Sequence, residues 1–191
     1  MEAEVRAMKF IDAFSRSYVL DVAPDWPERG EQIVSAHSFD HLGMHRDEFD
    51  YIRFYPRSGE SWTGQFEHGV ESESAVLSTP NESEVCVISA GAGYWVDVET
   101  RKVTTLKVRP ITSALPSSRH GLIFITTWHD LYAHRSKEPV WSLLHIAIDR
   151  LRIVAIQQDT MLTTCFGLTG EDLEMDIDLA ARTLLSTRPV G

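Results

Sequence analysis

Three histidines near the start of the chain have a spacing that could hold a metal ion. His37, His41 and His45 lie four residues apart, and on a helix this spacing brings imidazoles to one face, as in many zinc sites. Gly43 weakens such a helix, the glutamate of the H-E-x-x-H motif is missing, and the residues upstream favour extended chain. The sequence therefore predicts a polar segment here, with a metal-dependent enzyme as an alternative.

The sequence contains no arrangement typical of nucleophilic catalysis. The run Gly59–Gly64 is one residue too long for the G-x-S-x-G elbow. Cys86 and Cys165 both lie in apolar, strand-like runs rather than at a helix N-terminus, where a thiolate is favoured. Two cysteines also make no disulfide framework, so we expect buried, reduced thiols. These observations favour a protein that is not an enzyme and needs no cofactor.

Acidic and apolar residues alternate strictly near the end of the sequence, in the pattern of a half-buried strand. The acidic positions are Asp172, Glu174, Asp176 and Asp178. Their side chains are expected on one face of the strand, with neighbours about 7 Å apart. Such a row could meet arginine and lysine side chains of a partner, or protect an exposed sheet edge from pairing with other chains. Calcium is disfavoured because a strand lacks the tight turn and carbonyl ligands of a calcium loop.

Two tryptophans lie in polar, acidic stretches. Trp26 and Trp62 occur among acids that include Glu60 and Glu67. Tryptophan exposed among acids is typical of an interaction hot spot for a basic partner, although a loop packed on the core has the same composition. We predict a partner-binding surface made of these four residues and the acidic row.

Negative charge is concentrated in the first part of the chain. The 191 residues have a formal net charge of −10; residues 1–83 hold 16 acidic and 7 basic residues, and residues 84–191 hold 12 and 11. This balance argues against nonspecific nucleic-acid binding, which needs clustered Lys and Arg. It would steer a basic protein toward this one. We expect one compact domain in which the acidic region 1–83 packs onto region 84–191.

Targeting signals are not evident in the sequence. The residues after Met1 include no basic region followed by an apolar run, and no stretch approaches the ~20 apolar residues of a membrane helix. Arginine outnumbers lysine by 14 to 4, a bias typical of a GC-rich bacterial genome. We expect a bacterial, cytoplasmic protein that binds neither nucleic acid nor membrane.

One amphipathic helix is predicted at the N-terminus. Val5, Met8, Ile11 and Phe14 recur every three residues, with charged residues mostly elsewhere, which predicts a helix over residues 2–16.

The rest of the chain predicts strands. Continuous apolar runs at 85–88 and 122–125 have the length of buried strands. Residues 140–156 are interpreted as two strands because Ile and Val are dense there, with a helix that has Pro139 in its first turn as the alternative. Short polar turns between such runs predict an antiparallel meander. The expected fold class is mainly β (α+β), with the meander forming a sandwich or a partly closed barrel beside the N-terminal helix.

Two stretches of the chain look alike. Residues 94–106, YWVDVETRKVTTL, and residues 173–185, LEMDIDLAARTLL, each alternate around an aspartate and then continue through a polar turn into a second apolar run. This spacing resembles that of β-propeller blades, although 191 residues are too few for an ordinary propeller. It indicates β-meander construction.

Three classes of function remain. The first is a non-enzymatic protein-interaction domain that binds a basic partner, for example an immunity protein that neutralises a toxin. The second is a ligand-binding β-barrel or a structural subunit of a larger assembly. The third is the metal-dependent enzyme built on the histidines. The sequence leaves the oligomeric state open.

Overall fold

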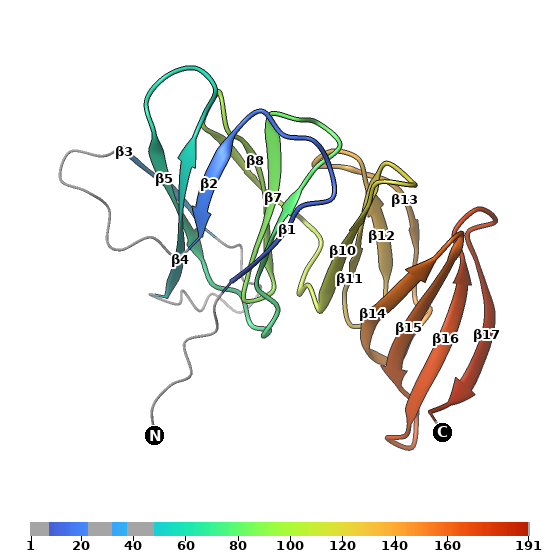
Figure 1. The fold of residues 1–191 in the computed structure, drawn as a ribbon. Helices are drawn as coiled ribbons and strands as arrows, with labels where there is room; N and C mark the ends of the chain where they lie inside the picture. Colours follow the sequence, from blue (N-terminus) through green and yellow to red (C-terminus); the bar gives the residue numbers. More distant parts are fainter. Residues whose placement is uncertain (1–7, 23–31, 38–47, 191) are drawn as a thin grey trace.

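All regular elements in the described part of the chain are β-strands. The structure is a computed structural model that describes residues 8–22, 32–37 and 48–190. Four sheets stand side by side in it, in a row that follows the chain from the N-terminal to the C-terminal side (Figure 1). These residues contain no helix, and so none long and apolar enough to cross a membrane. The prediction of a mainly β protein is confirmed.

The first two sheets are formed by the N-terminal half of the chain. Sheet I has the order β2 (Val19–Val22), β4 (Phe49–Tyr55), β5 (Trp62–Glu67) and β3 (Gln32–Ala36). Sheet II has the order β1 (Lys9–Ile11), β6 (Ala75–Ser78), β7 (Glu84–Ser89), β8 (Ala92–Asp97) and β9 (Lys102–Thr105). Each contains one parallel pair, β3 with β5 and β1 with β6, and the other pairs are antiparallel.

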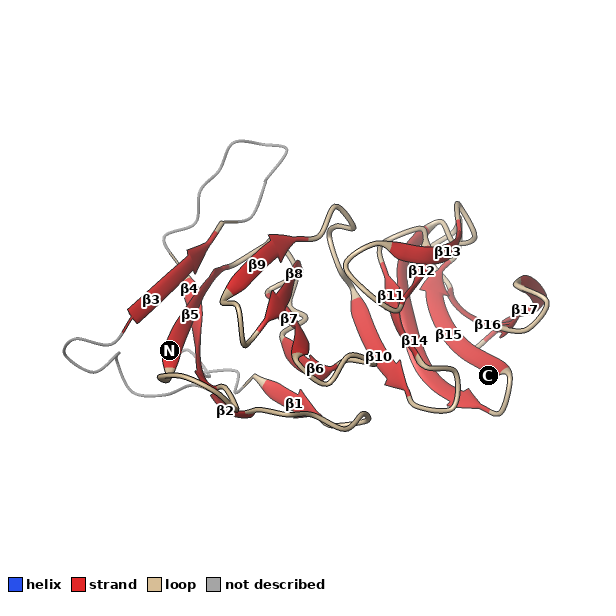
Figure 2. Cartoon of the chain, turned by 90° about the horizontal axis from the view of Figure 1, so that it is seen from above, coloured by secondary structure: helices blue, strands red, loops and turns tan. Residues whose placement is uncertain are grey.

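The last two sheets are simple antiparallel meanders. Sheet III has the order β10 (Ser113–Ser117), β11 (Leu122–Thr126), β12 (Leu131–His134) and β13 (Pro139–Leu143). Sheet IV has the order β14 (Asp149–Gln157), β15 (Thr160–Phe166), β16 (Asp172–Asp178) and β17 (Thr183–Pro189). The two strands predicted within 140–156 are therefore confirmed as β13 and β14. Seen from above, β6 to β9 of sheet II follow one another across the row, and so do β10 to β13 of sheet III (Figure 2).

The two middle sheets are buried on both faces. In β7, Val85 and Val87 pack into a core shared with sheet I, while Cys86 and Ile88 pack into a second core shared with sheet III. β11 divides its side chains in the same way between the second core and a third core shared with sheet IV. Because successive side chains of a strand point to opposite faces, a strand between two cores must be apolar throughout. This explains the runs at 85–88 and 122–125, and both are confirmed as buried strands.

This two-sided burial also corrects the expected architecture. A sandwich has two sheets with one apolar face each, and a barrel closes one sheet on itself. Here the meander starts a new sheet after about every four strands, and three separate cores lie between four sheets. Successive four-stranded sheets are the building plan of propeller blades. The expectation of a sandwich or partly closed barrel is wrong.

The two similar stretches occupy equivalent places in this plan. Residues 94–106 contain most of the hairpin β8–β9, and residues 173–185 contain β16 from its second residue and the start of β17. In each case these are the last two strands of their sheet. In both turns the aspartate accepts a backbone N–H: Asp97 from Thr100, and Asp178 from Ala180 and Ala181. In both, an arginine with positive φ, Arg101 at 59° and Arg182 at 57°, precedes the last strand. The repeated sequence therefore encodes a repeated turn.

No helix forms in the described part of the N-terminal segment. Residues 9–11 form β1, parallel to β6, and Phe10 and Ile11 point into different cores. A short strand with apolar side chains on both faces was mistaken for a helix with one apolar stripe. Residues 2–7 of the predicted helix lie outside the described residues.

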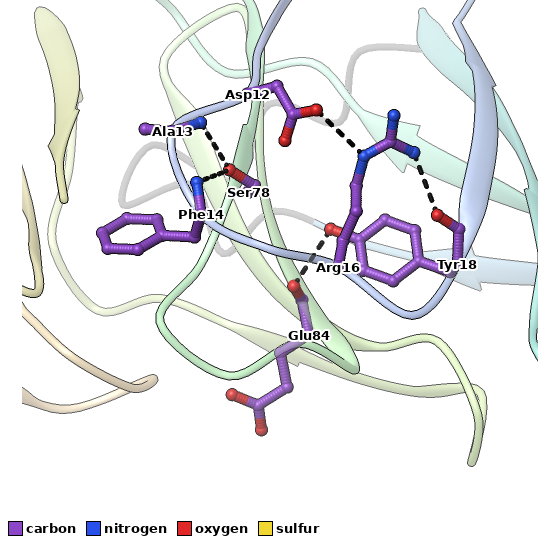
Figure 3. Close-up of polar contacts among 7 residues, drawn as sticks. All are labelled: Asp12, Ala13, Phe14, Arg16, Tyr18, Ser78 and Glu84. Atoms are coloured by element: carbon purple, nitrogen blue, oxygen red, sulfur yellow. Dashed lines mark hydrogen bonds and ion pairs between the residues drawn. The ribbon is translucent and has the colours of Figure 1, made fainter.

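The loop after β1 is fixed to the hairpin β6–β7 by hydrogen bonds (Figure 3). The Ser78 hydroxyl accepts the backbone N–H groups of Ala13 and Phe14 at 2.8 and 2.9 Å. The Tyr18 hydroxyl donates to the carbonyl of Glu84 at 3.1 Å, and burial raises the pKa of this phenol well above its usual range. The loop thus connects sheet II to β2 of sheet I. The division that we expected between residues 83 and 84 falls in the turn of β6–β7, whose two strands pair in one sheet.

Candidate functional site

The acidic row lies on the outer face of sheet IV, at one end of the stack of sheets (Figure 1). The intervening apolar residues of β16, from Leu173 to Ile177, and Leu179 just beyond the strand face the third core. The carboxylates of Asp172, Glu174, Asp176 and Asp178 therefore project away from that core, as the alternation predicts. The core side chains fix the position of the row, because a shift of β16 by one residue would expose all of them.

Three of the four carboxylates already have partners on their own sheet. Arg188 of β17 makes ion pairs with Glu174, at 2.9 Å, and with Asp176. The hydrogen bond from Arg188, followed by that from the Ser186 hydroxyl, holds the pKa of Asp176 below its usual range. Asp178 binds the backbone of the following turn. Asp172 lies beside a small cavity that also contains arginines.

β16 is not an edge strand. β17 pairs with it along its whole length, from Leu173 opposite Pro189 to Asp178 opposite Thr183. The interpretation of the row as protection of an exposed edge is therefore wrong, since β17 covers the edge of β16. The row stands inside the sheet; Glu174, for example, has Thr164 of β15 and Arg188 of β17 as its neighbours across the strands.

The tryptophan expected at a binding surface lies in the core instead. Trp62 is fully buried between sheets I and II, its ring 4.5 Å from that of Phe54, and its indole N–H donates to the carbonyl of Val98 at 3.0 Å. Glu67 is also buried, with 2% of its surface exposed. The expected exposure of both residues is wrong. Trp26 lies outside the described residues.

The remaining predicted residue, Glu60, is exposed but belongs to a different part of the molecule. It lies in the turn between β4 and β5, and its carbonyl accepts a hydrogen bond from Arg101. Sheet I and sheet IV stand at opposite ends of the row (Figure 1). The structure therefore does not bring Glu60, Trp62 and Glu67 together with the acidic row.

The predicted metal ligands are not assembled in the described part of the chain. The Nδ1 atom of His37 lies 3.6 Å from a carboxylate oxygen of Glu67. His41 and His45 lie outside the described residues. Among those that the structure describes, no group of three or more His, Cys, Asp or Glu side chains could hold a metal ion.

One polar cluster contains residue types of hydrolytic enzymes but not their arrangement. Asp50 accepts a hydrogen bond from the Ser89 hydroxyl at 2.7 Å and lies 3.3 Å from Nε2 of His68, whose Nδ1 is 3.5 Å from Glu48. A catalytic serine needs the imidazole as its base, with the carboxylate behind it. Here the carboxylate stands between serine and histidine, so the imidazole of His68 is not placed to take the proton of Ser89. The cysteines offer no alternative, because both are buried and burial raises the pKa of Cys86 to about 12.

A buried histidine supplies a pH-dependent contribution to stability. His134 has no exposed surface, stacks on Trp95 with ring centroids 6.2 Å apart, and accepts no hydrogen bond at Nε2. Burial lowers the pKa of His134, opposed by its hydrogen bond to the carbonyl of Ser136 and by Glu138. The unfolded chain therefore binds this proton at a higher pH than the folded protein, so stability falls as the pH drops below about 6.5.

We expect His134→Gln to remove this part of the pH dependence. Between about pH 7.5 and 5.5 the wild type should lose up to about 1.4 kcal/mol of unfolding free energy per pH unit through His134. The variant should show a flatter profile in denaturant titrations across the same range. Equal slopes for the two proteins would show that His134 is protonated as easily in the folded state as in the unfolded one.

Two arginines of functional interest were missed by the sequence analysis. Arg150 and Arg152 of β14 line the small cavity beside Asp172 on the outer face of sheet IV. The spacing of two arginines by two residues was visible in the sequence and places both on one face of a strand. The shift in register between β14 and β15, which sets the positions of the two arginines, was not visible in the sequence.

Comparisons with known proteins identify no family. No family model matches the chain, and no curated protein matches its sequence. Among solved structures, the chain is similar to the WD40 domain of coronin from Toxoplasma gondii, with a TM-score of 0.43 and 9% identity over 96% of this chain and 66% of that one. It is also similar to the extracellular domain of a protein described as a one-component system from B. thetaiotaomicron, with a TM-score of 0.45 and 11% identity over 84% of this chain and 25% of that one. The chain thus spans about two thirds of the first structure and a quarter of the second.

Proposed function

We propose that this protein is a non-enzymatic interaction domain that binds a basic protein partner on the outer face of sheet IV. An immunity-type protein that neutralises a basic toxin is the specific case that we favour. The observation that carries the proposal is the row of four carboxylates, held at fixed spacing by the core side chains of the same strand. The cytoplasmic location expected from the sequence stays a prediction.

The contacts of Arg188 support recognition of guanidinium groups by this row. One guanidinium fits between Glu174 and Asp176 and reaches both carboxylates. Arginine of a partner, which forms planar, paired hydrogen bonds with carboxylates, would find the same geometry at neighbouring positions of the row. The net charge of −10 would in addition accelerate the approach of a basic protein at low salt.

The proposal predicts that neutralising the row weakens binding of a basic ligand. The probe is a fluorescently labelled oligo-arginine peptide, whose dissociation constant is measured by anisotropy at two salt concentrations. The triple variant Asp172→Asn, Glu174→Gln, Asp176→Asn should bind about tenfold more weakly, since each exposed ion pair contributes about 0.2–1 kcal/mol. Arg188→Gln should bind more tightly, because it frees two carboxylates.

A matched control separates the row from the total charge. The control is a second triple variant that changes the charge by the same amount at exposed positions outside sheet IV: Glu60→Gln, Glu82→Gln and Glu138→Gln. This triple variant should bind nearly as the wild type does. If both triple variants lose the same affinity, the peptide responds to net charge alone and the proposed face is incorrect.

A further inference from the structure

The outer face of sheet IV also contains a small cavity with an excess of positive charge. The cavity has a volume of about 270 Å³ and is lined by Arg150, Arg152, Thr164, Cys165, Phe166 and Asp172. The charged groups among them are two guanidinium groups and one carboxylate. A singly charged anion would balance them. The volume is just below the roughly 300–1,000 Å³ of clefts that take drug-sized ligands, and suits a small group.

The two arginines have no acidic partner of their own. In the described part of the chain, neither guanidinium makes an ion pair or a side-chain hydrogen bond; that of Arg150 lies over the ring of Phe166, 5.3 Å from its centroid. By contrast, Arg16, Arg119 and Arg188 all pair with carboxylates. Among the described arginines, Arg135 and Arg182 also make no ion pair, so the distinguishing feature of Arg150 and Arg152 is that they line one cavity together.

A local distortion of β14 places Arg150 in the cavity. The register with β15 shifts between Asp149 and Arg152, so that Arg150 and Leu151 together stand opposite Cys165. Leu151 enters the core, and Arg150 has a φ of 50°, a backbone conformation that costs a residue with a side chain about 1 kcal/mol or more. Bulges of this kind redirect side chains at binding sites.

We propose that Arg150 and Arg152 form a binding site for an oxyanion, a phosphate or a carboxylate group. Both guanidinium groups donate to the oxyanion, as arginine does in charge-assisted pairs. The Thr164 hydroxyl, which is directly across from Arg152 in the sheet, donates a further hydrogen bond. Phe166 holds the Arg150 guanidinium by its ring face. The negative charge of Asp172 repels the bound anion and thereby lowers its affinity for the site. This site does not depend on the proposed binding of a basic partner, and Asp172 is the residue that the two share.

The test is a titration of the isotope-labelled full chain with inorganic phosphate and, separately, with acetate, followed by NMR of the arginine Nε–H groups. We expect saturable shifts of Arg150 and Arg152 with a dissociation constant on the order of 1 mM for at least one of the two anions. If phosphate binds more tightly than acetate, the natural ligand carries a phosphate group; if acetate binds more tightly, it carries a carboxylate. Absence of saturation with both would overturn the proposal.

Variants separate binding from folding. Arg152→Gln and Arg150→Gly should each weaken anion binding about tenfold or more. Arg150→Gly should fold at least as well as the wild type, because glycine accepts the positive φ. The matched control is Arg135→Gln, an equal charge change at an exposed position in the loop between β12 and β13, and it should bind normally. The site is wrong if Arg135→Gln weakens binding as much as the two cavity variants do.

Asp172 distinguishes this site from the binding of a basic partner. Asp172→Asn should strengthen anion binding about threefold or more by removing the opposing charge, and should weaken binding of the oligo-arginine peptide. The two proposals therefore predict opposite signs for one substitution. Unchanged or weaker anion binding in this variant would contradict the oxyanion site without affecting the proposed partner surface.

Discussion

Replacing Trp62 by alanine should lower the free energy of unfolding by about 3–5 kcal/mol. The side chain is fully buried between sheets I and II, beside Phe54 and Phe66, and its indole N–H is satisfied by Val98. The substitution removes this apolar contact and leaves both a cavity and an unpaired buried carbonyl. Urea denaturation followed by circular dichroism measures the loss.

Trp128 provides the matched control for this prediction. Its side chain is 39% exposed, and its indole N–H donates to a carboxylate oxygen of Glu71 at the surface. Trp128→Ala should therefore cost a small fraction of the loss at Trp62. If Trp62→Ala cost less than about 1 kcal/mol, the tryptophan would belong to the surface and the packing of sheet I on sheet II would be incorrect.

Replacing Ile177 by alanine is expected to destabilise the protein by about 2–5 kcal/mol. Ile177 has no exposed surface and lies in the core between sheets III and IV, next to an outward-facing carboxylate on each side in the sequence. The same denaturation experiment applied to Glu174→Gln, on the opposite face of β16, should show a much smaller loss. Comparable losses would mean that the two faces of β16 are assigned incorrectly.

The sequence predicted those strands whose patterns reflect one simple environment. β16, with one core face and one polar face, was found from its alternation, and β7 and β11 were found as continuous apolar runs. The number of cores was not predictable, because a continuous run does not indicate what lies on its two sides. The arrangement of four sheets in a row depends on contacts between residues far apart in sequence.

Two strands at sheet edges were difficult to see. β10 contains Pro116, which lacks an N–H group and is tolerated because β10 pairs on one side only. β1 has only three residues and is stabilised by its parallel pairing with β6 and by the two cores on its faces. From the sequence alone, neither segment can be distinguished as a strand from a loop or a helix.

The candidate site was predicted in part. The spacing of the acidic row was correct because strand geometry fixes it, whereas its partner Arg188 lies on a strand that the sequence did not define. The error at Trp62 came from weighting its polar neighbours above the alternation of Trp62, Gly64 and Phe66, which share one face. Gly64 is required there, because a Cβ atom would lie 2.6 Å from the ring of Phe66.

The most direct test of the proposed function is to map where a basic ligand binds. Backbone amide resonances of the labelled protein are followed during titration with the oligo-arginine peptide. The account predicts that the largest shifts occur in β16 and β17, over residues 172–178 and 183–189, and that they disappear at high salt. Largest shifts in sheet I or sheet II, with sheet IV unchanged, would contradict it.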